Sequence, residues 1–387
     1  MKYLLSFFMI LQSYSVLGDS WIQRADFPAV RSRAVGFTIG AKGYVGLGYR
    51  HQGNFFKDWW SYDPSSNTWT QQADFPGFER SDAFGFVIGN KGYVGCGHPF
   101  SDFFEYDPSN NTWNQKSNFP TARTEATAFS IGGKGYVGCG FIGLNRTNDF
   151  WEYDPASDTW LAKADVPGSP RSDAIGFSIN GNGYLGFGND TTGNFTNDFY
   201  EFDAGLNTWT NKPDFPGTPF YIGSSFVIGD CGYVTEANGN TFWQFNTVTN
   251  SWIQKTDFAG SLRENASSFE INGKGYVCIG DTGVVLNGSV QTSTVWEYSP
   301  DSLDGINELF FLQTGIQIYP NPVHDILVVR TSHPVELSAF TEEGKLLFEQ
   351  RKCIDGERIN VGNWAAGIYF LRVETNLKNN VYKLVKE

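Results

Sequence analysis

One position of the sequence recurs at intervals of 43 to 49 residues and holds arginine in five of its six copies. The copies are Arg31, Arg80, Arg123, Arg171, Phe220 and Arg263. A guanidinium group presents a planar fork of donors that matches a carboxylate or a sulfate, so a ring of such groups could hold an acidic ligand. In the fifth copy, Phe220 and Tyr221 would offer an aromatic face to a sugar.

A second series stands two residues after the first and is mostly polar. Its members are Arg33, Asp82, Glu125, Asp173, Ile222 and Asn265. The three carboxylates are candidates for general acid or base chemistry. Because an arginine stands close to each in sequence, we expect their pKa values to be low, which suits ligand contact better than acid catalysis. An Arg-x-acid pair can equally tie neighbouring structural units together, and both interpretations remain open.

Other catalytic patterns are weak. The residues from Gly138 to Gly143 spell GxGxxG, but they lead into a further strand, whereas a dinucleotide site needs a helix at this point. Histidine is scarce, and only His51 and His98 precede the tail, in equivalent loops. We therefore expect no metal, no cofactor and no assigned catalytic residue.

Internal repeats determine how these residues are positioned. Three phrases recur six times in fixed order, as in WTQQADFP (69–76), GYVGCG (92–97) and FEYDPSNNTW (104–113). A period of this length is typical of propeller blades. Apolar residues alternate along each repeat as they do in four short antiparallel strands. The Tyr and Trp on either side of the turn between the third and fourth strands are expected to pack against the next unit. With 44 glycines and 17% aromatic residues, the composition also indicates an all-β protein.

The repeat count predicts how the ring closes. The tryptophan-containing motif WIQRADFP at 21–28 has no strands of its own repeat before it. The sixth repeat, in turn, lacks such a motif after its third strand at 294–299. The N-terminal strand should therefore complete the last blade and remove the open sheet edges. We predict six blades over residues 19–300.

These phrases resemble the Kelch repeat family of β-propellers over nearly all of residues 19–300. The resemblance rests on the order of YDPxxNTW, the GY pair and the arginine after the xDFP turn; the fifth unit departs most, with Thr235 and Ala237 replacing glycines. In Kelch propellers the arginine position begins the innermost strand at the upper channel mouth, where some members hold acidic ligands. A galactose-oxidase-like copper site would need further ligands that no recognisable context supplies.

From residue 316 the repeats stop and a different pattern begins. Alternating apolar residues and turns at Asn321-Pro322 and Glu343-Gly344 predict a small β-sandwich. This part of the sequence resembles the type A C-terminal sorting domain of the type IX secretion system of Bacteroidetes. The residues that carry the resemblance are Tyr319, Pro320, Asn321, Pro322, Gly367 and Tyr369. That resemblance implies export to the surface or medium and the type IX machinery as a partner. An Ig-like binding module is the alternative.

Residues 1–18 place one lysine before an apolar run and end at Gly18, as a signal peptide does before cleavage; a first core strand is the alternative. Four of the five cysteines lie at or near one repeated position that adjacent units hold too far apart for disulfides, and Cys353 lies far away in the tail, so we expect small buried residues. The net charge of −13 disfavours nucleic acid and anionic membranes as partners, and no later segment is apolar enough to span a bilayer.

The expected organisation is a signal peptide (1–18), a six-bladed propeller (19–300), a linker (301–315) and a sorting domain (316–387). The expected function is non-catalytic binding or adhesion by a monomer that recognises a glycan or a protein through variable loops on the arginine face. A carbohydrate-active enzyme, resembling a sugar mutarotase or galactose oxidase, is the first alternative. A structural component of a surface apparatus is the second.

Overall fold

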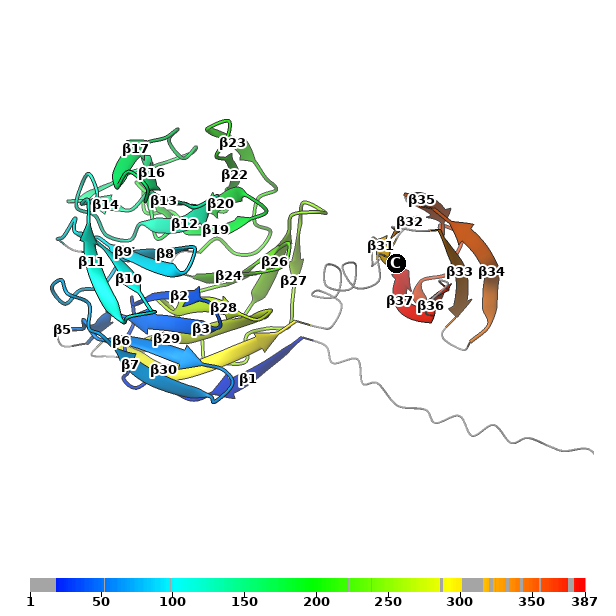
Figure 1. Ribbon diagram of the computed structural model, residues 1–387, viewed down its shortest axis with the longest axis horizontal. Coiled ribbons are helices and arrows are strands. Elements are labelled where there is room, and N and C mark those ends of the chain that lie inside the picture. Colours follow the sequence, from blue (N-terminus) through cyan, green and yellow to red (C-terminus); the bar gives the residue numbers. More distant parts are fainter. Residues whose placement is uncertain are drawn as a thin grey trace, which may run out of the picture. The chain divides into compact units, whose positions relative to one another are not determined.

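The computed structural model describes residues 19–51, 53–97, 99–220, 223–237, 239–285, 288–300, 316–319, 323, 325–331, 334–341, 344–354, 356–374 and 379–386. All secondary structure in these residues is β (Figure 1). The chain divides into two compact units, Met1–Asp301 and Ser302–Glu387. The predicted signal peptide with Gly18 and the predicted linker lie outside the described residues.

The first unit contains six four-stranded antiparallel sheets among its described residues. Sheets 1 to 5 follow one another along the chain, each from its innermost to its outermost strand. They are β2 (Val35–Ile39), β3 (Lys42–Gly46), β6 (Trp59–Asp63) and β7 (Thr68–Gln72); β8 (Phe84–Ile88), β9 (Lys91–Gly95), β10 (Phe103–Asp107) and β11 (Thr112–Lys116); β12 (Thr127–Ile131), β13 (Lys134–Gly138), β16 (Phe150–Asp154) and β17 (Thr159–Ala162); β19 (Ile175–Ile179), β20 (Asn182–Gly186), β22 (Phe199–Asp203) and β23 (Thr208–Asn211); β24 (Ser224–Ile228), β25 (Cys231–Thr235), β26 (Phe242–Asn246) and β27 (Ser251–Gln254).

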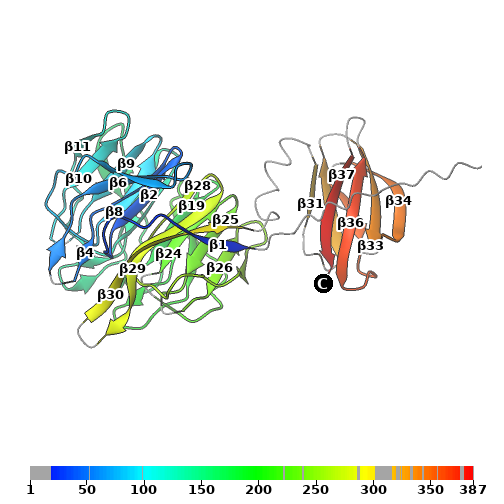
Figure 2. The same ribbon diagram turned by 90° about the horizontal axis from the view of Figure 1, so that it is seen from below.

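Sheet 6 joins the two ends of this unit. Its strands are β28 (Ser267–Ile271), β29 (Lys274–Val285), β30 (Gly288–Ser299) and, on the outside, β1 (Ser20–Arg24). Strand β1 pairs antiparallel with β30, and Trp21 lies opposite Tyr298. The strands β1 and β30 lie side by side in Figures 1 and 2. The innermost strands contact one another in the cycle β2, β8, β12, β19, β24, β28 and again β2.

The loops between these strands include three short two-stranded pairs. They are β4 (Tyr49–Arg50) with β5 (Asn54–Phe55), β14 (Phe141–Ile142) with β15 (Asn145–Arg146), and β18 (Arg171–Ser172) with β21 (Asn189–Asp190).

Alternation along the innermost strands separates the core from the central channel. In β2, Val35, Phe37 and Ile39 are buried, and the residues between them line the channel. The glycine of each GY pair makes room for a phenylalanine of the preceding sheet, since a Cβ on Gly43 would lie 2.3 Å from the Phe269 ring. These glycines therefore let adjacent sheets pack closely.

Aromatic residues tie each sheet to the preceding one. Trp69 of sheet 1 donates its indole N–H to the carbonyl of Ala25, 3.1 Å away, and the Asn67 side chain accepts from the Ala25 amide at 2.9 Å. Tyr62 packs on Tyr276 of sheet 6, with ring centroids 5.6 Å apart. The expected contact between units is therefore present, but its direction was predicted wrongly, because these residues face the preceding unit and not the next.

All five cysteines are buried thiols, and none forms a disulfide. Cys96, Cys139 and Cys278 are wholly buried, and their burial raises the pKa of each thiol to about 12. The expectation of small buried residues is confirmed.

The described residues of the second unit form two sheets. One is β31 (Ile316–Tyr319), β32 (Ile326–Thr331) and β35 (Glu357–Asn360); the other is β34 (Leu346–Cys353), β33 (Val335–Thr341), β36 (Gly367–Glu374) and β37 (Asn379–Lys386). Leu327 and Val329 of the first sheet share one buried cluster with Leu337 and Leu371 of the second. This cluster forms a core separate from that of the first unit.

Candidate binding site at the channel mouth

One end of the central channel is bounded by the segments that lead into the innermost strands. The loops after the second strands reach the same end, because antiparallel neighbours reverse direction. Here Arg33, Asp82, Glu125, Asp173 and Asn265 all adopt positive φ, between 54° and 59°. This left-handed conformation is unusual outside glycine, so its repetition indicates a shared structural requirement.

That requirement is a chain of backbone hydrogen bonds from sheet to sheet. The Arg33 amide donates to the Asn265 carbonyl at 3.0 Å, the Asp82 amide to Arg33 at 3.2 Å, the Glu125 amide to Asp82 at 3.3 Å and the Asp173 amide to Glu125 at 3.1 Å. We call these five residues the mouth ring. The corresponding residue of sheet 5, Ile222, lies outside the described residues.

The side chains of the mouth ring gather around one arginine. Arg33 Nη1 lies 2.9 Å from an Asp82 oxygen and 3.5 Å from a Glu125 oxygen. Burial alone would lower the pKa of the Arg33 guanidinium. The charge and hydrogen bond of Asp82, together with the charges of Asp173 and Glu125, outweigh burial and raise that pKa. One guanidinium therefore serves acids from two other sheets.

Asp173 has the opposite environment. Burial raises the pKa of its carboxyl well above the ordinary value, and the nearby charge and hydrogen bond of Glu125 raise it further. Arg33 opposes this shift without cancelling it. The expectation of uniformly low pKa values was wrong for Asp173, because the single arginine of the ring cannot neutralise three carboxylates. The Asp173 carboxyl therefore keeps its proton to a higher pH than an ordinary aspartate does.

A second acidic group lies beside the ring on sheet 6. The Asn265 side chain donates to Asp281 at 2.9 Å, and His51 Nε2 lies 3.9 Å from an Asp281 oxygen. Burial, and then the charge of Asp281, raise the pKa of Glu264. The mouth is thus acidic on this side as well.

The arginine series is buried instead of lining the mouth. Arg31, Arg80, Arg123, Arg171 and Arg263 are all at most 3% exposed. In the first four, the guanidinium binds an aspartate that immediately precedes the third strand of the same sheet, as Arg123 does with Asp149 at 2.8 and 2.7 Å. The prediction of free forks is therefore wrong for Arg31, Arg80, Arg123 and Arg171, because aspartates of their own sheets already occupy these forks. Arg263 is buried as well and donates to Thr294.

Phe220 does not offer a face to a ligand either. It is 3% exposed and packs against Phe187 and Phe215, with ring centroids 4.9 and 5.4 Å away. An apolar side chain has thus replaced a buried guanidinium, so this part of the prediction is also wrong. Tyr221 lies outside the described residues.

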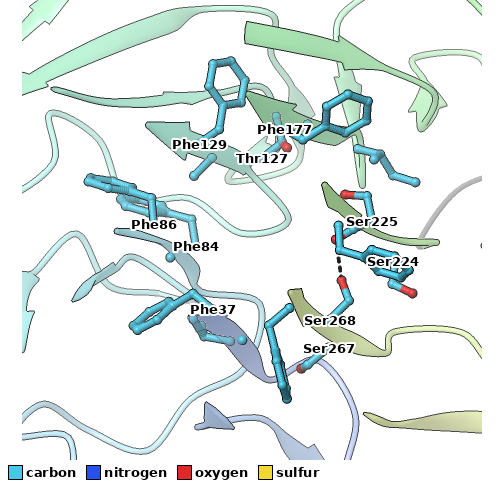
Figure 3. Close-up of a pocket in the computed structure, with 18 of the residues that line it drawn as sticks. Phe37, Phe84, Phe86, Thr127, Phe129, Phe177, Ser224, Ser225, Ser267 and Ser268 are labelled. Atoms are coloured by element: carbon cyan, nitrogen blue, oxygen red, sulfur yellow. Dashed lines mark hydrogen bonds between the residues drawn. The ribbon is translucent and has the colours of Figure 1, made fainter. Parts of the chain in front are cut away.

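Behind the mouth ring the channel is a cavity of about 620 Å³. Figure 3 shows residues of the six innermost strands around it, among them Thr127, Ser225 and Ser268. The Ser268 hydroxyl donates to the Ser225 carbonyl at 2.6 Å. Small residues and hydroxyls leave room for water or a small polar molecule.

Large apolar side chains project from the loops at the mouth end. Phe78 is 73% exposed and stacks on Phe100 with ring centroids 5.5 Å apart, while Phe55 and Phe195 are 44% and 40% exposed. Exposed aromatic groups on loops are common at recognition surfaces. Sequence analysis missed Phe78 because it lies just before the repeated arginine, outside the variable loops. Its aromatic character at a turn position was the available signal.

No group of three or more potential metal ligands occurs among the described residues. His98 lies outside them. Within the same part of the chain, no helix is long and apolar enough to cross a membrane.

Comparison with known proteins identifies the tail. Residues 317–387 match the family model of the secretion system C-terminal sorting domain. This is a type IX sorting domain. It indicates a protein exported to the cell surface or the extracellular space, and it implies the type IX machinery of Bacteroidetes-like bacteria as a partner. In this sorting domain Tyr369 is buried, its hydroxyl donates to the Ala365 carbonyl at 2.7 Å, and Gly367 begins β36. Tyr319 ends β31; Pro320, Asn321 and Pro322 lie outside the described residues.

For the first unit the comparisons give only the fold. The solved structure entitled "Structure of YjhT" is similar over 70% of this chain and 95% of its own, with a TM-score of 0.60 and 17% sequence identity. No curated protein matches the sequence. The YjhT likeness supports a propeller-like arrangement and carries no information on activity.

Proposed function

We propose that the first unit is a six-bladed Kelch-type propeller that binds a glycan or a protein through its mouth-end loops, in a protein that acts by adhesion or recognition outside the cell. The exposed stack of Phe78 on Phe100 is the observation that carries this proposal. An aromatic face of this kind can pack on a sugar ring or on an apolar side chain. The acidic mouth ring beside it would select polar or cationic groups of the ligand.

Loss of the exposed aromatic ring tests the proposal. Phe78→Ala should weaken binding of the full chain to its ligands on a glycan array by about tenfold, since an aromatic contact of this size contributes roughly 1–1.5 kcal/mol. Leu206→Ala is the matched control, because Leu206 is similarly exposed at 72% but lies in the β22–β23 turn at the other end of the sheet. Equal binding by the two variants would remove Phe78 from the site.

A carbohydrate-active enzyme is the second candidate, and the Glu125–Asp173 pair favours it. A carboxyl whose pKa is raised can keep its proton at higher pH and donate it to a sugar oxygen, as a mutarotase or epimerase requires. Exchange between sugar anomers, measured by NMR, should then be faster with the wild-type chain than with Asp173→Asn. Asp214→Asn, at an exposed position, is the control. Identical exchange with all three chains would leave binding as the only proposed role.

A further inference from the structure

A triad of a buried arginine, an aspartate and an aromatic donor recurs in the loop regions of sheets 1, 3 and 4, and sheet 2 has the arginine and the aspartate. In each of these four sheets the buried arginine binds the aspartate that precedes the third strand: Asp58, Asp102, Asp149 or Asp198. In three of these sheets an aromatic residue of the same strand donates to that carboxylate, namely Trp60 at 2.7 Å, Trp151 at 2.7 Å and Tyr200 at 2.8 Å. The carboxylate thus receives donors from both sides.

Sheet 6 keeps both donors and lacks the carboxylate. The sequence TVWEYS (294–299) aligns with DFWEYD (149–154), so Thr294 stands where the aspartate would be and Trp296 where the donor tryptophan is. Arg263 donates to the Thr294 hydroxyl at 2.9 Å and to the carbonyls of Thr294 and Ile279 at 3.2 and 3.3 Å. No described carboxylate contacts it. The Trp296 indole nitrogen is buried and has no hydrogen-bond partner among the described residues.

The loss of a partner has electrostatic consequences for Arg263. Its side chain is buried, with 3% of the residue exposed, and burial lowers the pKa of its guanidinium to about 10. In sheet 4, by contrast, Asp198 outweighs burial and raises the pKa of Arg171. A buried charge without a counter-charge is strongly unfavourable. Sheet 6 therefore carries a cation that its own described residues do not neutralise.

Sheet 5 provides an internal comparison. It too has threonine, Thr241, in place of the aspartate, but there Phe220 stands in place of the arginine, so no buried guanidinium needs a counter-charge. In this sheet the arginine and its aspartate are missing together. Retention of Arg263 in sheet 6 therefore indicates that a counter-charge comes from outside the triad.

We propose that sheet 6 binds the carboxylate group of a separate molecule between Arg263, Trp296 and Thr294, in the place that aspartate occupies in the first four sheets. In the first four sheets the side chains of the corresponding aspartates are 22–29% exposed, so this position lies near the surface of the unit. The guanidinium and the indole would bind the carboxylate oxygens, and the Thr294 hydroxyl would contribute a third donor. This proposal does not depend on the function of the loops at the mouth.

Thermal unfolding of the full chain with sodium acetate tests the site. Eleven of the twelve tryptophans lie in the first unit, so tryptophan fluorescence reports its transition. Acetate should raise the wild-type Tm towards a plateau, because a ligand that binds only the folded state stabilises it. Thr294→Asp rebuilds the aspartate of the first four sheets. Its Tm should exceed that of the wild type without acetate by about 2–4 °C and should respond little to acetate.

Thr294→Asp also controls for ionic strength, because salt screening acts on both chains. Trp296→Phe, which keeps the ring and removes the donor, should shift the acetate midpoint to higher concentration. Glucuronate in place of acetate separates two sources of the carboxylate: a response to both acids indicates a group carried on a sugar, and a response to acetate alone indicates a small free acid. A wild-type Tm that ignores both acids, or that follows Thr294→Asp at every concentration, would overturn the proposal.

Discussion

At the level of single residues, two positions only two apart in the chain have different surroundings: Arg80 is buried, whereas Asp82 belongs to the mouth ring. The series that includes Arg80 and the series that includes Asp82 were both located correctly by spacing. Their assumed mutual pairing was wrong, because Arg80 pairs with Asp102, 22 residues away, and Asp82 with Arg33. A spacing of two residues suggests that the side chains of Arg80 and Asp82 lie close together. The positive φ of Asp82 instead turns its side chain away from the buried arginine and towards the mouth. Sequence spacing alone does not reveal such a backbone reversal.

The raised pKa of Asp173 leads to a pH prediction. A carboxyl whose folded pKa lies above its unfolded value favours folding at low pH, and this contribution is lost as pH rises from about 4 through the folded pKa. Asp173→Asn cannot ionise, so it should be more stable than the wild type at pH 7–8, with each kcal/mol recovered raising Tm by about 2–4 °C. The difference should shrink towards pH 4.

Thermal unfolding of both chains between pH 4 and pH 8 is the measurement. The substitution leaves the contacts of Arg33 with Asp82 and Glu125 in place, so the comparison reports on Asp173. Asp165→Asn, at an exposed position, should follow the wild type. A wild-type chain at least as stable as Asp173→Asn at pH 8 would contradict the assigned environment.

At the level of elements, periodicity predicted the strands well because each repeat carries the same apolar alternation and the same turns. The separate tryptophan motif at 21–28 also predicted that the N-terminal strand completes the last sheet, and the structure contains this pairing of β1 with β30. The bends of the long strands β29 and β30 were not predictable, since they arise from register shifts between Cys278 and Gly280 and between Asp281 and Val284.

Trp21 should be the main anchor of β1. Its ring packs within 5.0 Å of the Phe242, Phe258 and Tyr298 ring centroids. Trp21→Ala should lower the free energy of unfolding by about 2–4 kcal/mol, as truncation of a large packed aromatic residue does. Ile22→Ala, on the same strand but at a position 48% exposed, should change it by less than about 1 kcal/mol. Denaturant titrations followed by fluorescence would compare them, and equal losses would exclude a special role for Trp21.

At the level of the whole molecule, the two units have different tasks. The sorting domain directs export, and its sequence motifs made the location outside the cell predictable. The ligand of the first unit was not predictable, because the repeated residues determine only the scaffold. Recognition depends on loop side chains that differ from one repeat to the next. Phe78, at one sheet only, is an example.

Removal of the tail tests this division. In a bacterium with type IX secretion, a chain lacking residues 316–387 should remain inside the cell envelope, while the full chain reaches the surface or the medium. Immunoblots of cell, surface and medium fractions measure the difference. The reciprocal control joins residues 316–387 to an unrelated exported reporter, which should then leave the cell. Recovery of the shortened chain from the medium in wild-type amounts would show that export does not need the tail.

The closure of sheet 6 by β1 also has a mechanical consequence. The chain leaves the first unit after Ser299, the last residue of β30, which lies between β29 and β1. Tension transmitted through the tail would therefore pull β30 lengthwise against hydrogen bonds on both of its edges. Arg24 of β1 adds two bonds of 2.7 Å to Glu297. Bonds loaded together in shear resist force better than bonds that are peeled apart singly. The N-terminal strand would therefore act as a clamp when the protein is held through its mouth-end loops and pulled through its tail.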